Sequence, residues 1–164
     1  MGVFRMWAVA GGLLAVVSTG TLTGCGPRYV TNTEIEYTEP KQALANLVER
    51  YRVAMEQRDA DAIRALVSRR YYENGSTTND PADDYDYAGL NKVLADLENH
   101  VKAVKYEIEI QAIDVYEDTA TVDYEYHSQF MYAVGPQDRW STAADRNRLT
   151  FRKEHGDWRI VSGL

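Results

Sequence analysis

The apolar residues of this 164-residue chain change their spacing once, and that change constrains the fold more than any other feature. Between residues 38 and 101 they recur every three or four positions, which is typical of helices that bury one face. From residue 105 onward they alternate with polar residues, which is typical of strands with one covered face. Helices followed by a meander of strands predict an α+β domain, with the N-terminal helices packed on one face of a curved antiparallel sheet.

Three helices are expected in the first half of this domain, which is predicted to span residues 38–164. The first begins near Thr38, whose side chain can cap a helix, and Pro40 suits its first turn. A second helix begins at Asp59, and a third runs from about Ala88 to His100. The apolar stripe of the first helix consists of Leu44, Leu47, Val48, Tyr51, Ala54 and Met55.

Four strands are expected to follow, over residues 105–112, 119–130, 146–154 and 157–164. Because alternate residues of a strand point to opposite faces, one set should face the helices. That set is Tyr106, Ile108, Ile110, Ala112, Val122, Tyr124, Tyr126, Ser128, Asn147, Leu149, Phe151, Trp158 and Ile160.

The opposite set of strand residues is charged. Its acidic members are Glu107, Glu109, Asp123 and Glu125, and its basic members are Arg146, Arg148 and Arg152. If the strands that carry them are neighbours, opposite charges should pair across the outer face of the sheet. Such a face serves solubility or recognises a partner, and the pattern alone does not separate these two roles.

Residues 1–24 have the layout of a secretory signal peptide, with Arg5 near the start and small residues at the end. The apolar run between them, Met6 to Val17, has 12 residues, whereas a helix that spans a bilayer needs roughly 20. The alternative is a buried helix of the folded domain, which the lack of a polar face disfavours. The segment therefore predicts export from a bacterial cytoplasm.

The four residues Leu22-Thr23-Gly24-Cys25 resemble the lipobox of bacterial lipoproteins, and Cys25 is the only cysteine in the chain. The resemblance implies cleavage before Cys25 and lipidation of its thiol and amine, so that acyl chains bind the protein to a membrane. Gly26 stands where an Asp would signal retention at the inner membrane, which favours the outer membrane, facing the periplasm. Residues 25–37 are then expected to be a tether.

The charge of the chain excludes one class of partner. The net charge of −7 becomes −8 without residues 1–24, which hold Arg5 and no acidic residue. An acidic domain repels phosphate backbones, so nucleic acid is not expected to bind. With a single cysteine there is no disulfide within the chain, and the core alone must hold the fold.

The order of elements resembles the cone-shaped nuclear transport factor 2-like superfamily, which includes polyketide-cyclase-like and ketosteroid-isomerase-like proteins. The resemblance covers residues 40–164 and rests on two stretches, "ALANLVERYRVAMEQRDADAIRALVS" and "RLTFRKEHGDWRIVSGL". It implies a pocket between the concave face of the sheet and the helices. Members are enzymes, ligand-binding proteins or interaction modules, so the resemblance alone does not choose a function.

Tyrosines dominate the strand positions expected to face that pocket. The pocket candidates are Tyr106, Tyr124, Tyr126, Ser128, Asn147 and Trp158. The alternative interpretation is a tyrosine-rich core whose hydroxyls reach solvent or the main chain. Neither a histidine nor a metal-binding set occurs on this face, and neither a metal nor another cofactor is expected.

Asp114 is the one carboxylate that continues the inward alternation, although its neighbours Ile113 and Val115 are apolar. Either Asp114 is a catalytic base in the pocket, or a β-bulge near residues 112–113 turns it outward. The acidic loop around Asp84 and Asp86 departs from a calcium-binding loop at Ala88 and predicts a helix cap instead.

These observations predict a lipid-anchored envelope protein whose domain binds a small hydrophobic ligand or another envelope protein, without evident catalysis. A homodimer is also compatible with the sequence. The alternative is a small isomerase or hydrolase, similar to ketosteroid isomerase, that uses Asp114 with the tyrosines. The position of Asp114 separates the two hypotheses.

Overall fold

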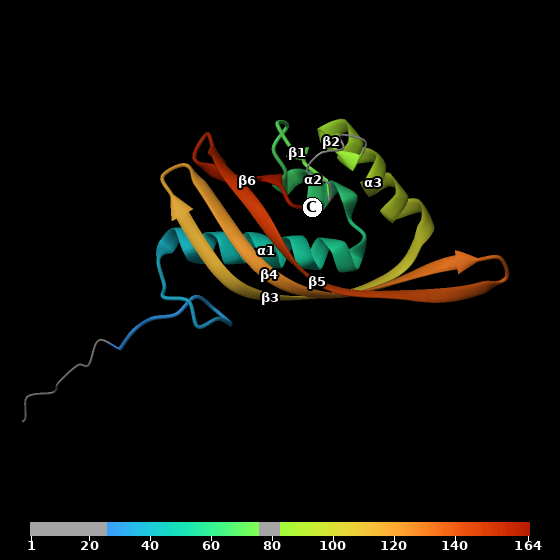
Figure 1. The fold of residues 1–164 in the computed structure, drawn as a ribbon, viewed down its shortest axis with the longest axis horizontal. Coiled ribbons are helices and arrows are strands. Elements are labelled where there is room, and N and C mark those ends of the chain that lie inside the picture. The colour runs from blue at the N-terminus through green and yellow to red at the C-terminus, as the bar shows by residue number, and fades with distance from the viewer. Residues whose placement is uncertain (1–25, 76–82) are drawn as a thin grey trace, which may run out of the picture.

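The computed structural model describes residues 26–75 and 83–164. Within them, helices α1 (Glu39–Gln57), α2 (Ala60–Leu66) and α3 (Tyr87–His100) accompany the short strands β1 (Tyr72–Glu73) and β2 (Tyr85–Asp86). The main sheet contains β3 (Val101–Tyr116), β4 (Thr119–Val134), β5 (Gln137–Glu154) and β6 (Asp157–Ser162). The sheet curves around the helices, which occupy its concave side (Figure 1). The predicted α+β class is confirmed.

Each helix begins where the sequence provides a capping side chain. The Thr38 hydroxyl accepts a hydrogen bond from Lys41 N at 3.4 Å, and Asp59 accepts one from Ala62 N at 2.8 Å. Asp86 caps α3 by accepting from the main-chain N–H groups of Ala88 and Gly89. These caps satisfy donors that a helix N-terminus leaves free, which is why the predicted boundaries are confirmed to within a residue.

The strands of the main sheet pair in the order β3-β4-β5-β6, each antiparallel to the next. The predicted third strand begins too late, because β5 starts at Gln137 and not at residue 146. Residues 133–148 are exposed on both faces, so no alternation of burial marks this part. Here the hairpin of β4 and β5 projects beyond the helices (Figure 1).

A β-bulge shifts the register of β3 against β4 between Ile110 and Ala112. Before the bulge Ile110 faces the helices, and after it Ile113 does so, with 2% of its surface exposed. Asp114 consequently lies on the outer face and is exposed. The predicted bulge is confirmed, one or two residues earlier than expected.

The core lies between α1, α2 and the concave face of the sheet. Its largest fully buried side chains are Tyr71, Tyr124, Phe151, Leu44, Ile63, Leu90, Leu149, Ile160, Val30, Val48 and Val122. The stripe predicted on α1 supplies Leu44, Val48 and Tyr51 to this core. Within the described part of the chain, no helix is long and apolar enough to cross a membrane.

Most of the segment expected to be a tether is folded. Tyr37 N donates to the main-chain oxygen of Arg28 at 2.7 Å, and Val30 N donates to that of Ile35 at 2.8 Å. The turn between them brings Val30 into the core, where 1% of its surface is exposed. Within the predicted tether, the described residues ahead of this hairpin are therefore Gly26 and Pro27 alone.

Two of the ion pairs predicted for the charged outer face are present. The Arg148 guanidinium lies 2.5 Å from the Asp123 carboxylate, and Arg146 lies 2.6 Å from Glu125. Arg152 is an exception, because the register places it opposite Thr119. The Arg148 guanidinium also lowers the pKa of Asp123 through a hydrogen bond, which is a consequence of this pairing.

Candidate functional site

An apolar cavity of about 600 Å³ lies between α3 and the sheet, at the end where β3 begins. Its lining residues are Tyr51, Met55, Ile63, Leu90, Val93, Leu94, Asp96, Leu97, His100, Val101, Phe130, Tyr132 and Leu164. The helices α1, α2 and α3 therefore form its walls, and Phe130 and Tyr132 of β4 contribute from the sheet. A concave, mainly apolar cavity of this size is typical of small-molecule binding sites.

The cavity exists because α3 is not fully packed on the sheet. This helix ends at His100, and β3 begins at Val101 with no loop between them. Its apolar stripe buries Leu90, Leu94 and Leu97, whereas 52% of the Val93 surface remains exposed. An apolar side chain left in water at the edge of a cavity is unfavourable unless something covers it.

The side chains of Asp96 and His100 lie together at one part of the cavity lining. His100 Nδ1 lies 3.3 Å from Asp96 Oδ1, one turn earlier on α3, and both side chains are largely exposed. Both residues line the cavity, so they form a polar rim beside its apolar walls. The rim can hydrogen-bond a polar group of a molecule whose apolar part lies inside.

Leu164 is held in the cavity wall by a network of tyrosines. The Tyr85 hydroxyl donates to the main-chain oxygen of Leu164 at 2.5 Å, and Leu164 N donates to the Tyr71 hydroxyl at 3.0 Å. The Tyr71 hydroxyl in turn donates to the Glu73 carboxylate at 2.9 Å. Burial raises the pKa of Tyr71 and of Tyr85, so both remain neutral donors near neutral pH.

The structure brings the predicted tyrosines Tyr106, Tyr124 and Tyr126 together under α1. The ring centres of Tyr106 and Tyr126 are 5.8 Å apart, and those of Tyr124 and Tyr126 are 6.2 Å apart. Tyr51 packs edge-on against Tyr106 at 5.9 Å. Of these four, only Tyr51 also lines the α3 cavity, so the cluster is packed as core and not as the wall of that cavity.

Burial raises the pKa of Tyr51, Tyr106 and Tyr124 far above the ordinary value. These side chains therefore stay neutral and do not act as bases. Tyr124 is buried, with 1% of its surface exposed, so water does not reach its hydroxyl readily. That hydroxyl has no hydrogen-bond partner among the described residues. An unpaired buried hydroxyl is costly, which makes it the weak point of an otherwise tightly packed cluster.

The remaining pocket candidates lie elsewhere. Ser128 is buried, and its hydroxyl donates to the main-chain oxygen of Ala143 at 3.4 Å. Asn147 is exposed and donates from Nδ2 to Gly163 O at 3.1 Å. Trp158 lines a separate hollow between α1, α2 and β6, with Lys153 Nζ 5.8 Å from its ring centre. None of the three lines the α3 cavity.

Asp114 does not reach the concave face, because the bulge turns it outward. It therefore cannot be the base of a site beside the tyrosines, on which the isomerase-like or hydrolase-like alternative depended. The acidic loop has a structural explanation, since Asp84 accepts from the Tyr72 hydroxyl at 2.6 Å and from Gly75 N at 3.1 Å. Over residues 26–75 and 83–164, no three potential metal ligands gather at one point.

Cys25 and the signal segment lie outside the described residues, as does Asp80 of the acidic loop. Lipidation of Cys25 therefore stays a prediction. The resemblance implied a pocket between the concave face and the helices, but its position under α3 and its lining residues were not predicted, although one signal for them was present. Val93 belongs to the predicted apolar face of the third helix, and that face is wider than the sheet beneath it covers.

The overall arrangement is found in several solved structures of bacterial proteins. A nuclear transport factor 2-like superfamily protein from Salmonella enterica superimposes with a TM-score of 0.59 at 17% identity, covering 75% of this chain and 87% of that one. A ketosteroid isomerase-like protein from Erwinia carotovora atroseptica gives 0.61 at 19% identity, with coverages of 78% and 98%. The chain has the nuclear transport factor 2-like fold.

A third structure agrees with this assignment. A nuclear transport factor 2-like protein of unknown function from Pseudomonas putida gives a TM-score of 0.61 at 15% identity, covering 77% of this chain and 85% of that one. The sequence itself matches no protein-family profile, and no curated protein matches it significantly. At these identities the nuclear transport factor 2-like fold is shared, whereas residues that carry an activity are not transferred.

Proposed function

We propose that the nuclear transport factor 2-like domain is a binding module that holds one small, mainly apolar molecule in the α3 cavity. The observation that carries this proposal is the cavity itself, with about 600 Å³ of space and apolar side chains from three helices and two strands. Its volume lies within the range of roughly 300–1,000 Å³ that is usual for ligand sites. The exposed side chain of Val93 gains a partner when such a molecule binds.

The charge of the domain narrows the class of ligand. Without residues 1–24 the chain has a net charge of −8, which repels anionic molecules. The polar rim of Asp96 and His100 accepts one hydroxyl, carbonyl or amine at the mouth of the cavity. A neutral or cationic molecule with a single polar end is therefore the chemistry that fits best.

The second part of the proposal is the location of this module. Acyl chains on Cys25 would hold it at the bacterial cell envelope, on the outer membrane facing the periplasm. The support is the signal-like segment, the resemblance of Leu22-Thr23-Gly24-Cys25 to a lipobox, and the absence of Asp at Gly26. Since the hairpin begins at Arg28, an anchor at Cys25 would keep the domain close to the membrane surface.

A pair of valine substitutions tests the ligand site. The test uses a chain of residues 26–164. Val93→Trp fills the cavity, whereas Val134→Trp makes the same change on the hairpin of β4 and β5, at a residue of similar exposure. Binding of the neutral dye Nile red, followed by its fluorescence, should weaken at least about tenfold in the first variant and remain unchanged in the second. Equal binding by both variants would place the dye elsewhere and contradict the proposal.

The anchor is tested separately by Cys25→Ser in a bacterial host supplied with labelled palmitate. The unsubstituted chain should be processed, labelled and recovered with the outer membrane. The variant should keep residues 1–24 and carry no label, because serine offers no thiol to acylate. A labelled serine variant would refute the lipoprotein assignment without affecting the cavity.

A further inference from the structure

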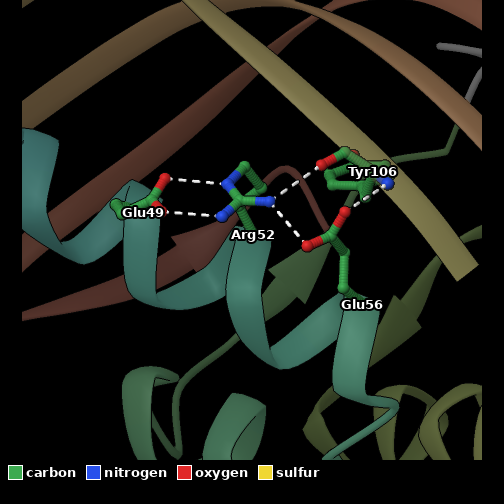
Figure 2. A network of polar contacts seen from close by, with 4 residues as sticks. All are labelled: Glu49, Arg52, Glu56 and Tyr106. Atoms are coloured by element: carbon green, nitrogen blue, oxygen red, sulfur yellow. Dashed lines mark hydrogen bonds and ion pairs between the residues drawn. The ribbon is translucent and has the colours of Figure 1, made fainter. Parts of the chain in front are cut away.

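One edge of the main sheet is formed by β3, because the strand order begins with it. An edge strand presents unpaired N–H and C=O groups that can pair with another chain. Part of this edge is closed by side chains of α1. Arg52 donates to the main-chain oxygen of Tyr106 at 3.3 Å, and Glu56 accepts from Tyr106 N at 3.2 Å (Figure 2).

The Arg52 side chain that closes this part of the edge is itself held by two glutamates of α1. Glu49 and Glu56 hold the Arg52 guanidinium at 2.8 and 2.7 Å, as Figure 2 shows. Further along the helix, Arg58 donates to the main-chain oxygen of Val101 at 2.5 Å. The helix thus runs antiparallel to β3, and its long charged side chains bind both main-chain groups of Tyr106 and the main-chain oxygen of Val101.

The next part of the edge is not closed in this way. In an antiparallel pair the residues of a strand direct their N–H and C=O groups alternately to the partner strand and away from it. Because the groups of Tyr106 point away from β4, those of Ile108 and Ile110 do so too. No hydrogen bond from the described residues reaches these outward groups of Ile108 or Ile110.

A hollow of about 190 Å³ accompanies this open edge. It is lined by Thr31, Asn32, Gln42, Ala45, Asn46, Val48, Glu49, Ile108, Glu109 and Ile110. Five α1 residues line it, and Ala45 has the shortest side chain among them. Ile108 and Ile110 are only partly buried, so apolar surface borders the free main-chain groups.

The charges beside the open edge define the partner. Glu107 and Glu109 point to the outer face and are exposed, and no cation among the described residues pairs with either of them. On the β4 side, the register places Glu109 opposite Glu125, which already binds Arg146. At the edge of this face the carboxylates of Glu107 and Glu109 are therefore unpaired. Glu109 also faces the like charge of Glu125 on β4.

We propose that the β3 edge at residues 107–110 accepts an extended peptide segment as an additional strand, with Lys or Arg at alternate positions. Main-chain groups of the segment pair with those of Ile108 and Ile110. Its basic side chains lie beside Glu107 and Glu109, and the side chains between them face the hollow next to Ala45. This site is distinct from the α3 cavity and does not depend on a ligand there.

A second copy of the chain is a poorer occupant of this edge. Antiparallel pairing of two β3 edges around residues 107–110 would place Glu107 and Glu109 of one copy beside those of the other. Four carboxylates side by side oppose such pairing. The charge pattern favours a basic partner.

The first test uses the full chain in neutral detergent and two blocked, fluorescent peptides, Lys-Val-Lys-Val-Lys and Glu-Val-Glu-Val-Glu. Fluorescence anisotropy should show binding of the basic peptide and at least about tenfold weaker binding of the acidic one, because charge complementarity selects the partner. Hydrogen exchange with residue-level mass spectrometry should show protection of the Ile108 and Ile110 amides only when the basic peptide is bound. Binding without that protection would overturn the proposal.

The second test reverses the edge charge. In Glu107→Lys/Glu109→Lys the preference between the two peptides should invert, whereas Glu117→Lys/Asp118→Lys, which changes the charge by the same amount at the turn between β3 and β4, should leave it unchanged. An unchanged preference in the double variant contradicts the site. Sedimentation of the unsubstituted chain provides a further check, because a dimer that prevents the basic peptide from binding would show that the edge belongs to a second copy.

Discussion

The concave face of the sheet is closed under α1 and open under α3. Under α1, aromatic rings from the helix and two strands pack at centre distances of 5.8 to 6.2 Å, and this cluster adds only Tyr51 to the cavity wall. Under α3, the same face ends in a cavity of about 600 Å³. One sheet face therefore serves both as core and as candidate binding site, and the helix above it makes the difference.

The physical reason lies in how each helix meets the sheet. The helix α1 runs along β3 and is held to its edge by Arg52, Glu56 and Arg58. The helix α3 leads directly into β3 at Val101, so it is attached to the sheet at its end. A helix held along its length excludes space beneath it, whereas one attached at an end leaves a wedge.

The largest effect should come from removing a ring on the closed side. Tyr106→Ala leaves a void between Tyr51 and Tyr126, and the free energy of unfolding should fall by about 3–5 kcal/mol. Phe130→Ala, at a partly buried residue beside the cavity, should cost less than half as much. Urea denaturation of both variants measures the contrast. Equal costs would mean that the open side is packed as tightly as the closed side.

A smaller effect should come from the tyrosine that holds the cavity wall. Tyr71→Phe removes the hydroxyl that binds Glu73 and Leu164 N, and the free energy of unfolding should fall by about 1–3 kcal/mol. Thermal denaturation, followed by circular dichroism, measures the loss. An unchanged melting temperature would show that this network does not hold Leu164 in place.

The smallest effect, and one of opposite sign, should come from the closed side. Tyr124→Phe deletes a buried hydroxyl that has no partner among the described residues, so stability should rise by about 1 kcal/mol. The matched Tyr71→Phe variant is its control, because the same atom is removed from a tyrosine whose hydroxyl is bonded. A loss of stability in Tyr124→Phe would show that this hydroxyl is hydrogen-bonded and would contradict the prediction.

Much of the architecture was predictable because it depends on local patterns. Thr38, Asp59 and Asp86 mark helix starts through their side chains alone, and strand alternation placed Tyr106, Tyr124 and Tyr126 on one face. The bulge was one of the two alternatives that the sequence offered for Asp114, and the apolar neighbours of Asp114 pointed to it. These features follow from periods of 3.6 and 2 residues and from the cost of burying a charge.

The candidate site was far less predictable. The alternation along the strands predicted the pocket residues, but the cavity is lined mainly by α3 and by the end of β4. Asn147 follows the inward alternation and lies opposite the buried Tyr124, yet it is exposed. The hairpin around Val30 was also missed, since its turn shows no sustained hydrophobic period.

The sequence by itself determined the α+β class, the helix starts, the two faces of the sheet, the acidic character and a signal-like start with one cysteine. All of these features depend on residues that are close together along the chain or on the overall composition and charge. Only the tertiary structure decided which part of the concave face stays open and which part of the β3 edge stays unpaired. Both depend on the distance between a helix and a strand that are far apart in sequence, and no local period encodes that distance.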